Sequence, residues 1–181
     1  MRMAYGHTFK IVYAIVISSI LSSCMTRAPI RPYNPSTDHE ALIEIFNQNW
    51  YWLDYRSQDE GLRTFKHDLD SLTTVGDFGE TLPLSWLVYA TGSHINGFAA
   101  YCQKSPTVGK ILFLATNTKD RRRGYAQQLL QAALDEFKRT GVLSVDLATR
   151  VTNTPAQTLY KKFGFVETQR DDTFVYFTKQ L

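Results

Sequence analysis

Three consecutive arginines stand beside a glycine in this 181-residue sequence, in the run Arg121-Arg122-Arg123-Gly124-Tyr125-Ala126. Arginine side chains are permanently cationic, multidentate donors that suit phosphate oxygens. Gly124 tolerates a positive φ and lets a ligand approach the backbone, and Ala126 is too small to block that approach. A helix that begins here adds unpaired N–H groups and the positive end of its dipole. The run predicts an anion-binding turn, although three arginines are also typical of a solvated loop.

The residues on both sides of this turn predict a strand and a helix that position it. Residues 111–115 are continuously apolar, as in a buried strand. After the turn, apolar residues recur every three or four positions and form one helical face: Ala126, Leu129, Leu130, Ala133, Leu134 and Phe137. Gly141 is a helix stop signal. This context favours the anion site over the solvated loop.

A second group of candidate residues follows the next predicted strand, residues 142–149. Asn153 precedes a short helix that has Pro155 in its first turn and ends at Gly164. Asn153 caps this helix or binds a ligand, and one side chain can do both. Tyr160 lies on the apolar face, which is typical of a core tyrosine, and its phenol is also a candidate proton donor.

The first half of the chain predicts two helices and three strands. Residues 30–33 form a short edge strand, and Thr37 with Glu40 makes a capping box for a helix that ends near Leu53. A second helix covers about residues 60–72, and residues 73–83 read as a loop. Strands at 84–90 and 95–102 are expected to form an antiparallel hairpin, with a solvent-exposed, passive His94 in its turn.

An aromatic cluster lies between the two predicted helices and comprises Trp50, Tyr51, Trp52 and Tyr55. These side chains complete the core and its rim, or they form one wall of an acceptor pocket. At the C-terminus, residues 165–168 and 174–178 predict a final hairpin around Asp171 and Asp172.

Composition excludes several classes of protein. The net charge is +3, and two positive charges, Arg2 and Lys10, lie in the first 24 residues, which leaves +1 for residues 25–181. This balance argues against nucleic-acid binding over a broad face. The two cysteines form neither a disulfide framework nor a zinc site, and Cys102 is expected to be a small buried hydrophobe. The four histidines lack ligand spacing, so no metal site is predicted.

Residues 1–24 resemble a bacterial lipoprotein signal peptide. A positive start is followed by the uncharged apolar run 11–21 and by Leu21-Ser22-Ser23-Cys24. The run is about half the ~20 residues of a membrane-spanning helix. Lipidation of Cys24 would anchor the protein to a membrane. Alternatively, translation starts at Met25, residues 1–24 are an over-extended N-terminus, and the protein is cytoplasmic.

Together the two motifs resemble the GCN5-related N-acetyltransferase superfamily over residues 28–181. The acetyl-CoA motif of that family has arginine or glutamine, two residues, glycine, one residue, then glycine or alanine, as in the run from Arg121 to Ala126. The second motif is matched by Asn153, Ala156, Leu159-Tyr160 and Lys162-Phe163-Gly164-Phe165. The resemblance implies an N-acetyltransferase domain of the α/β (α+β) class, with a mixed, mostly antiparallel sheet of six to seven strands and about four helices.

The resemblance also implies the roles of individual residues. Backbone N–H groups of Arg122, Arg123, Gly124, Tyr125 and Ala126 would hold the pyrophosphate of acetyl-CoA, together with Arg121. The pantetheine arm would pair with the open strand edge at Leu114, Ala115 and Thr116, with a contact from Asn153. Tyr160 would be the general acid and the only catalytic residue carried over. The acceptor would be a small-molecule or peptide amine.

The chain departs from the family at the general base. Many members carry a glutamate on the strand before the arginine turn, and residues 111–116 here contain neither an acid nor a histidine. A base must come from elsewhere or through water, with Asp146, Asp54, His67 and Glu80 as candidates. The departure leaves open a second interpretation, a catalytically degenerate CoA-binding or protein-interaction module.

Overall fold

A central sheet with helices on both faces organises residues 29–181, the part of the chain that the computed structural model describes. The elements in chain order are β1 (Ile30–Pro32), α2 (Pro35–Leu53), α3 (Gln58–Ser71), β2 (Thr73–Val75), β3 (Thr81–Pro83), β4 (Ser85–Thr91), β5 (His94–Ser105), β6 (Val108–Thr116), the 3-10 helix η1 (Thr118–Asp120), α4 (Tyr125–Arg139), β7 (Ser144–Arg150), α5 (Thr154–Lys162), β8 (Val166–Arg170) and β9 (Phe174–Gln180).

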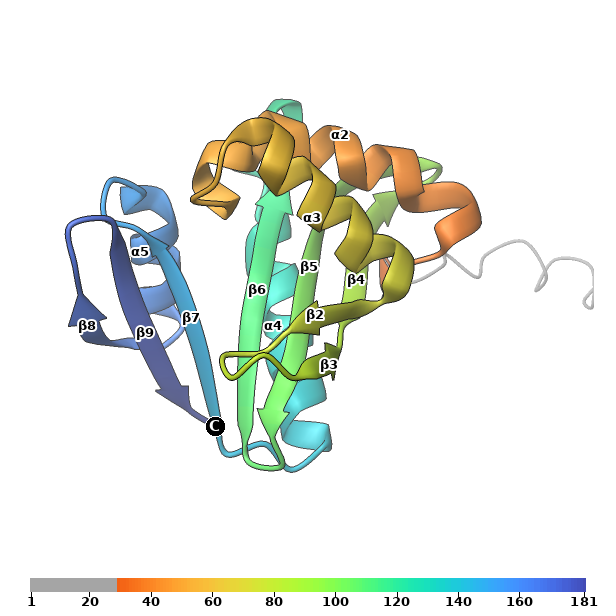
Figure 1. The fold of residues 1–181 in the computed structure, drawn as a ribbon. Coiled ribbons are helices and arrows are strands. Elements are labelled where there is room, and N and C mark those ends of the chain that lie inside the picture. Colours follow the sequence, from red (N-terminus) through yellow and green to blue (C-terminus); the bar gives the residue numbers. More distant parts are fainter. Residues whose placement is uncertain (1–28) are drawn as a thin grey trace, which may run out of the picture.

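Seven strands form the main sheet in the order β1-β4-β5-β6-β7-β9-β8. Every neighbouring pair is antiparallel except β6 and β7, which are parallel. Helices α2 and α3 cover one face, and α4 and α5 lie against the other (Figure 1). The expected mostly antiparallel sheet of six to seven strands with four α-helices is confirmed for the described residues.

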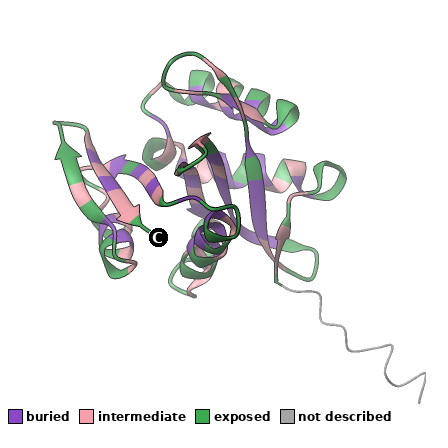
Figure 2. Ribbon diagram, turned by 90° about the horizontal axis from the view of Figure 1, so that it is seen from below, coloured by how far each residue is buried: buried purple, intermediate pink, exposed green. Residues whose placement is uncertain are grey.

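Two hydrophobic clusters, one on each face of the sheet, hold these layers together. The cluster under α2 and α3 is centred on stacked aromatic rings, with Phe46 and Phe65 4.2 Å apart. The cluster under α4 contains Leu129, Leu130 and Phe137, which the helical periodicity placed on the inner face. Figure 2 shows the buried residues along the strands between exposed outer helix faces. Cys102 is buried as expected.

The N-cap of helix α2, Asn34, lies three residues before the predicted cap, Thr37. The Asn34 side chain accepts a hydrogen bond from the Ser36 N–H at 3.0 Å, and Pro35 occupies the first turn. Thr37 and Glu40 therefore lie inside the helix, and the prediction of Thr37 as the cap was wrong. Asparagine is among the best N-caps and proline suits the first helical position, so this pair outcompetes the threonine.

Residues 73–83 contain a small hairpin, so the prediction of a simple loop was wrong. Strand β2 pairs with β3 in antiparallel register. At the tip, the Asp77 carboxylate bonds to Lys104 at 2.7 Å and Lys110 at 2.9 Å, both on the main sheet. These lysine hydrogen bonds lower the pKa of Asp77 to about 2. The ion pairs therefore fix the hairpin across the lower part of β5 and β6.

The expected signal segment 1–24, including Cys24, and the alternative start Met25 lie outside the described residues. Among residues 29–181, no helix is long and apolar enough to cross a membrane.

Candidate active site

The two halves of the sheet separate between β6 and β7. These strands pair only at their beginnings, from Val108 opposite Ser144 to Lys110 opposite Asp146. Beyond Lys110 they diverge, while β6 stays paired with β5 and β7 with β9 (Figure 1). A cleft of about 800 Å³ lies here and is lined by residues of both strands. Its floor includes Leu114, Ala115 and Thr116, the predicted pantetheine edge.

An irregularity in β6 accompanies the separation. Ala100 lies opposite Phe113 and Tyr101 lies opposite Ile111, so Leu112 has no partner on β5. Such a β-bulge bends the strand and increases its twist. On the β7 side, residues 111–116 have no strand partner within the described chain. Apart from the Thr116 carbonyl, which accepts from the Asn49 amide at 3.2 Å, their backbone groups on this side are therefore available to a bound molecule in the cleft.

The arginine turn lies at the end of β6, as predicted. Arg122 has φ +67° and Gly124 has φ +82°, so the chain reverses through two left-handed residues before α4. The helix begins without a side-chain cap. Within residues 29–181, no group accepts a hydrogen bond from the backbone N–H groups of residues 122–127. Convergent N–H groups at a helix N-terminus form an anion site.

The three arginines have different surroundings. Arg121 donates to the Asn49 side-chain oxygen at 2.7 Å, and Arg123 lies 3.6 Å from the Asp120 carboxylate. Arg122 lines the cleft and has no carboxylate within 4.0 Å among the described residues. Arg121 likewise lines the cleft without a carboxylate partner, but Asn49 holds its guanidinium, so Arg122 is the member of the triplet whose side chain has no partner among the described residues.

Asn49 was not predicted as a site residue. Its amide donates to the Ile45 carbonyl at 2.7 Å and to the Thr116 carbonyl at 3.2 Å, while its oxygen holds Arg121. It thus joins α2 to the end of β6 and to the arginine turn. A buried amide among apolar helix positions is the signal that could have identified it, because buried polar groups need partners.

His94 supports the same turn, so its prediction as a passive residue was wrong. Its Nε2 lies 2.7 Å from the Asp120 carboxylate, which also accepts from Asn96 at 3.1 Å. The hydrogen bond from His94 lowers the pKa of Asp120. Asp120 therefore stays ionised and holds Arg123, beside the start of the anion-binding turn.

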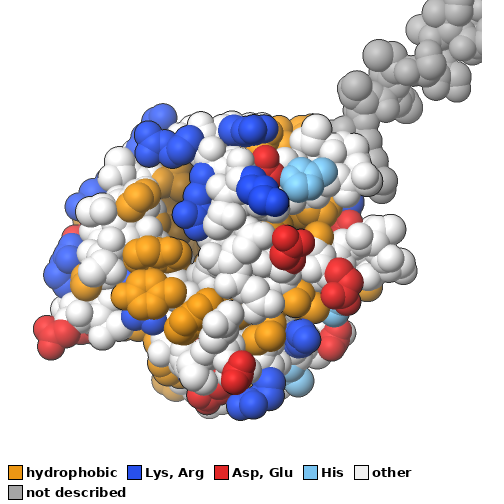
Figure 3. Space-filling model, turned by 90° about the horizontal axis from the view of Figure 1, so that it is seen from above, with side chains coloured by type: hydrophobic (Ala, Val, Ile, Leu, Met, Phe, Trp, Pro, Cys, Tyr) orange, Lys and Arg blue, Asp and Glu red, His pale blue; other side chains and the backbone are white. Residues whose placement is uncertain are grey.

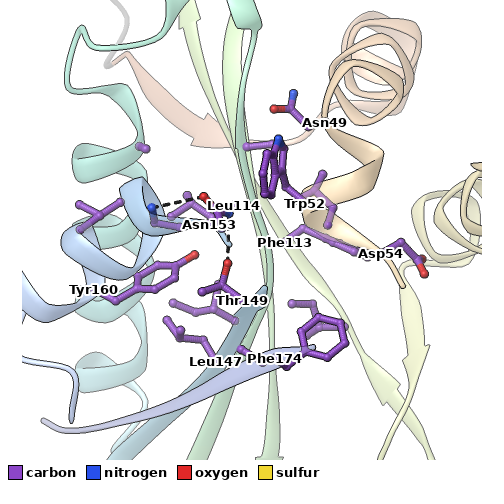
Figure 4. Close-up of a pocket in the computed structure, with 18 of the residues that line it drawn as sticks. Asn49, Trp52, Asp54, Phe113, Leu114, Leu147, Thr149, Asn153, Tyr160 and Phe174 are labelled. Atoms are coloured by element: carbon purple, nitrogen blue, oxygen red, sulfur yellow. Dashed lines mark hydrogen bonds between the residues drawn. The ribbon is translucent and has the colours of Figure 1, made fainter. Parts of the chain in front are cut away.

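Tyr160 projects from α5 into the cleft (Figure 4). Its ring packs against Phe165 and Phe177 at 5.9 and 6.0 Å, and only 7% of the residue is exposed. Its hydroxyl points toward the space between β6 and β7 (Figure 4), and no group of residues 29–181 hydrogen-bonds it. Burial raises the pKa of Tyr160 to about 12. The residue is thus both part of the core and a protonated phenol facing the cleft.

Asn153 caps α5 and lines the cleft. Its oxygen accepts from the Ala156 N–H at 3.4 Å, and its amide donates to the Thr149 hydroxyl at 3.1 Å (Figure 4). Among the other predicted cofactor residues, Arg123, Gly124 and Tyr125 do not line the cleft, and the Tyr125 ring packs against the Tyr89 ring, with the ring centres 4.4 Å apart. The backbone of these three residues still forms the turn.

The four candidate bases are mostly remote from the cleft or already paired. Asp146 accepts from the Thr178 hydroxyl at 2.8 Å, Glu80 accepts from the Phe78 N–H at 2.9 Å, and His67 is exposed on α3. Of the four, Asp54 alone lines the cleft, and its two oxygens accept from Arg56 at 2.9 and 2.7 Å. The described residues also contain no group of three or more potential metal ligands.

Comparison with known proteins identifies the class to which this fold and cleft belong. A family model described as the acetyltransferase (GNAT) family matches residues 40–165, and the chain therefore belongs to this family. The chain is 27% identical over 152 residues to a mycothiol acetyltransferase of Acidimicrobium ferrooxidans, covering 82% of this chain and 46% of that protein. It is 33% identical over 79 residues to a ribosomal protein bS18 alanine N-acetyltransferase of Haemophilus ducreyi, covering 44% of this chain and 54% of that protein. The chain thus spans about half the length of these curated relatives.

Solved structures show the same architecture. Ard1 from Thermoplasma volcanium is 25% identical with a TM-score of 0.63, over 84% of this chain and 96% of that one. The PaiA N-acetyltransferase from Thermoplasma acidophilum was solved in complex with coenzyme A. It is 20% identical with a TM-score of 0.64, over 84% of this chain and 98% of that one.

Proposed function

We propose that the protein transfers an acetyl group from acetyl-CoA to a primary amine by direct attack on the thioester. One observation carries the proposal: a splayed strand edge, a turn of unpaired N–H groups and a buried phenol all meet in one cleft. Each of them suits a different part of acetyl-CoA. The coenzyme A bound to the Thermoplasma acidophilum relative supports the same ligand class.

The diphosphate fits the turn, where the N–H groups of residues 122–126 and the free guanidinium of Arg122 would neutralise it. Arg123 would shape the turn through Asp120, whereas Arg121, held by the neutral amide of Asn49, would add its charge beside Arg122. The open edge of β6 at Leu114–Thr116 offers N–H and C=O groups that match the amides of the pantetheine arm. Asn153, at the facing edge, is a further candidate contact.

In the reaction, the neutral amine nitrogen attacks the thioester carbonyl and forms the C–N bond. The tetrahedral intermediate then loses a proton from nitrogen to water and collapses as the C–S bond breaks. A backbone N–H on the open edge of β6 would stabilise the oxyanion of the tetrahedral intermediate. Tyr160 would donate a hydrogen bond, and finally its proton, to the departing sulfur. With a phenol pKa of about 12 against ~8.5 for a thiol, this transfer is uphill in isolation. The phenol therefore acts only when the thiolate lies directly in front of it.

The effect of Tyr160→Phe on acetyl transfer tests this assignment. We expect the variant to lose roughly 10²-fold or more in kcat while its Kd for coenzyme A changes little. Tyr176→Phe is the matched control, because Tyr176 also lines the cleft but its hydroxyl bonds to Asp171 at 3.1 Å. Equal rates in both variants would remove Tyr160 from the mechanism. Coenzyme A binding without turnover of any amine would favour the degenerate binding module instead.

Membrane attachment through a lipidated Cys24 remains a separate proposal from the sequence. The apolar run 11–21 followed by Leu21-Ser22-Ser23-Cys24 supports it. The intact mass of the native protein tests it: a lipidated N-terminal Cys24 is the expected result, and an unmodified start at Met25 or Thr26 would contradict it.

A further inference from the structure

The end of the cleft opposite the arginine turn is lined mainly by aromatic side chains. Trp52 and Tyr55 come from the end of α2 and the following loop, and Phe174 and Tyr176 come from β9. Trp52 and Phe174 approach the space in front of the Tyr160 hydroxyl from two sides (Figure 4). Trp52 is 36% exposed and Tyr55 is 70% exposed. Large aromatic faces this accessible at a cleft mouth are well suited to contact a ligand.

The charges around this end are unfavourable for a polycation. Asp54 is the single carboxylate among the residues that line the cleft within the described chain, and the cations at this end are its partner Arg56 and Arg150, whose guanidinium lies 5.7 Å from the centre of the Phe174 ring. The Asp54 side chain is 4% exposed, is held by Arg56, and points away from the space before Tyr160 (Figure 4). An acceptor with several ammonium groups would therefore find no unpaired carboxylate among the residues that line the cleft. Asp171 and Asp172 lie outside the cleft, in an adjoining hollow with Arg150 and Tyr55.

The surface view agrees with this distribution. Figure 3 shows hydrophobic side chains gathered around a hollow, with Lys and Arg at its rim, while most Asp and Glu on this face lie at a distance from it. The hollow thus presents an apolar interior with a cationic border.

We propose that the acceptor is a monoamine whose body is aromatic or otherwise apolar, seated between Trp52 and Phe174 with its nitrogen toward Tyr160. This inference rests on the proposed acetyl transfer and adds the substrate class. It also accounts for the missing base. Apolar walls and nearby cations both disfavour an ammonium ion and lower its pKa. The amine then enters in its neutral form, and its proton is lost to water rather than to a carboxylate of the protein.

The rate of coenzyme A release with three amines tests the substrate class. At one pH, 2-phenylethylamine should exceed ethanolamine in kcat/KM by at least about tenfold, the effect of burying a phenyl group, and spermidine should be the poorest acceptor. A preference for spermidine, or equal values for all three, would overturn the inference while leaving acetyl transfer intact. Turnover of none of them, despite coenzyme A binding, would overturn the proposed function as well.

Variants of two aromatic residues test whether the acceptor preference arises in the cleft. Trp52→Ala and Phe174→Ala should each reduce the ratio of phenylethylamine to ethanolamine at least threefold, while coenzyme A affinity, measured in parallel, shows that the fold is retained. Phe78→Ala is the matched control, because Phe78 is an aromatic residue 97% exposed at the β2–β3 hairpin and does not line the cleft. An unchanged ratio in both cleft variants, or an equal drop in the control, would overturn the inference.

The pH dependence of kcat/KM tests whether the protein supplies a general base. If the neutral amine binds, the rising limb of kcat/KM must follow the pKa of the free acceptor. A phenylethylamine with fluorine next to the amine-bearing carbon has a lower amine pKa, and its limb should move to lower pH by the same interval. A limb that stays in place for both acceptors would identify a titrating base on the protein and contradict this part of the inference.

Discussion

Replacing Gly124 by alanine should weaken coenzyme A binding far more than it weakens the fold. Gly124 has φ +82°, a conformation that costs an alanine about 1–2 kcal/mol. A methyl group on Gly124 would meet no protein atom within 4 Å, so this strain is the main effect on stability. For a domain of this size, it lowers Tm by roughly 2–8 °C.

The effect on binding is larger because the methyl group would occupy the space in front of the turn. If it displaces the diphosphate from two charge-assisted hydrogen bonds, each worth ~1.5–3 kcal/mol, the loss is about 3–6 kcal/mol. The Kd for coenzyme A should then rise at least about hundredfold.

Gly141→Ala is the matched control. Gly141 has φ +81° and likewise leaves open space for a methyl group, but it follows the C-terminal end of α4, roughly 20 Å from the turn. Thermal unfolding should show similar losses for both variants, and isothermal titration calorimetry should show weakened binding for Gly124→Ala alone. The same Kd in the two variants would refute the assignment of the diphosphate to this turn.

Three further predictions follow from individual contacts. Arg122→Ala should raise the Kd for coenzyme A about tenfold or more, and Arg123→Ala less than about threefold, since Asp120 already holds the latter; calorimetry giving equal changes would contradict the distinction. Gly109→Ala should cost about 1–3 kcal/mol of unfolding free energy in urea, because its Cβ would overlap the Phe137 ring, and an unchanged midpoint would argue against that packing. Two lysines lower the pKa of Asp77 to about 2, so the stabilising effect of its carboxylate should persist above about pH 4 and be lost as the pH falls toward 2. Asp77→Asn should flatten this part of the stability–pH curve, and parallel curves for the variant and the unmodified protein would contradict the prediction.

Local patterns were enough to predict most of the fold. The apolar periodicity of residues 126–137 gave the buried face of α4, and all of Leu129, Leu130, Ala133, Leu134 and Phe137 are buried. Gly124 and Gly141 mark the two ends of this helix, both with positive φ. Such features depend on residues within a few turns of one another, so the sequence carries them directly.

The separation of β6 from β7 could not be derived from periodicity, because it depends on which strands pair beyond Lys110. The link from Arg121 to Asn49 joins residues 72 positions apart. The hairpin at residues 73–83 was missed for a similar reason: each strand has three residues, and ion pairs from Asp77 to lysines on β5 and β6 hold its tip. Short strands of this kind carry little pattern of their own.

The clearest miss concerns charge. The sequence did not distinguish the three arginines and predicted a passive His94. In the structure each arginine has different neighbours, and His94 hydrogen-bonds to the Asp120 carboxylate. The acceptor end likewise needed the fold, because Trp52 and Phe174 meet only after α2 and β9 are brought to one cleft. Of the two interpretations of the aromatic cluster, the one that assigns it to the core holds for Trp50, which packs against the core.

Amide chemical shifts during a titration with coenzyme A would test the central claim most directly. In a 15N-labelled sample, we expect the largest changes at the backbone N–H groups of residues 122–127 and along the open edge of β6 at residues 111–116. The amides around Gly141, which follows the C-terminal end of α4, should move little. Saturating coenzyme A that leaves the turn unshifted, or that shifts another surface instead, would contradict the account.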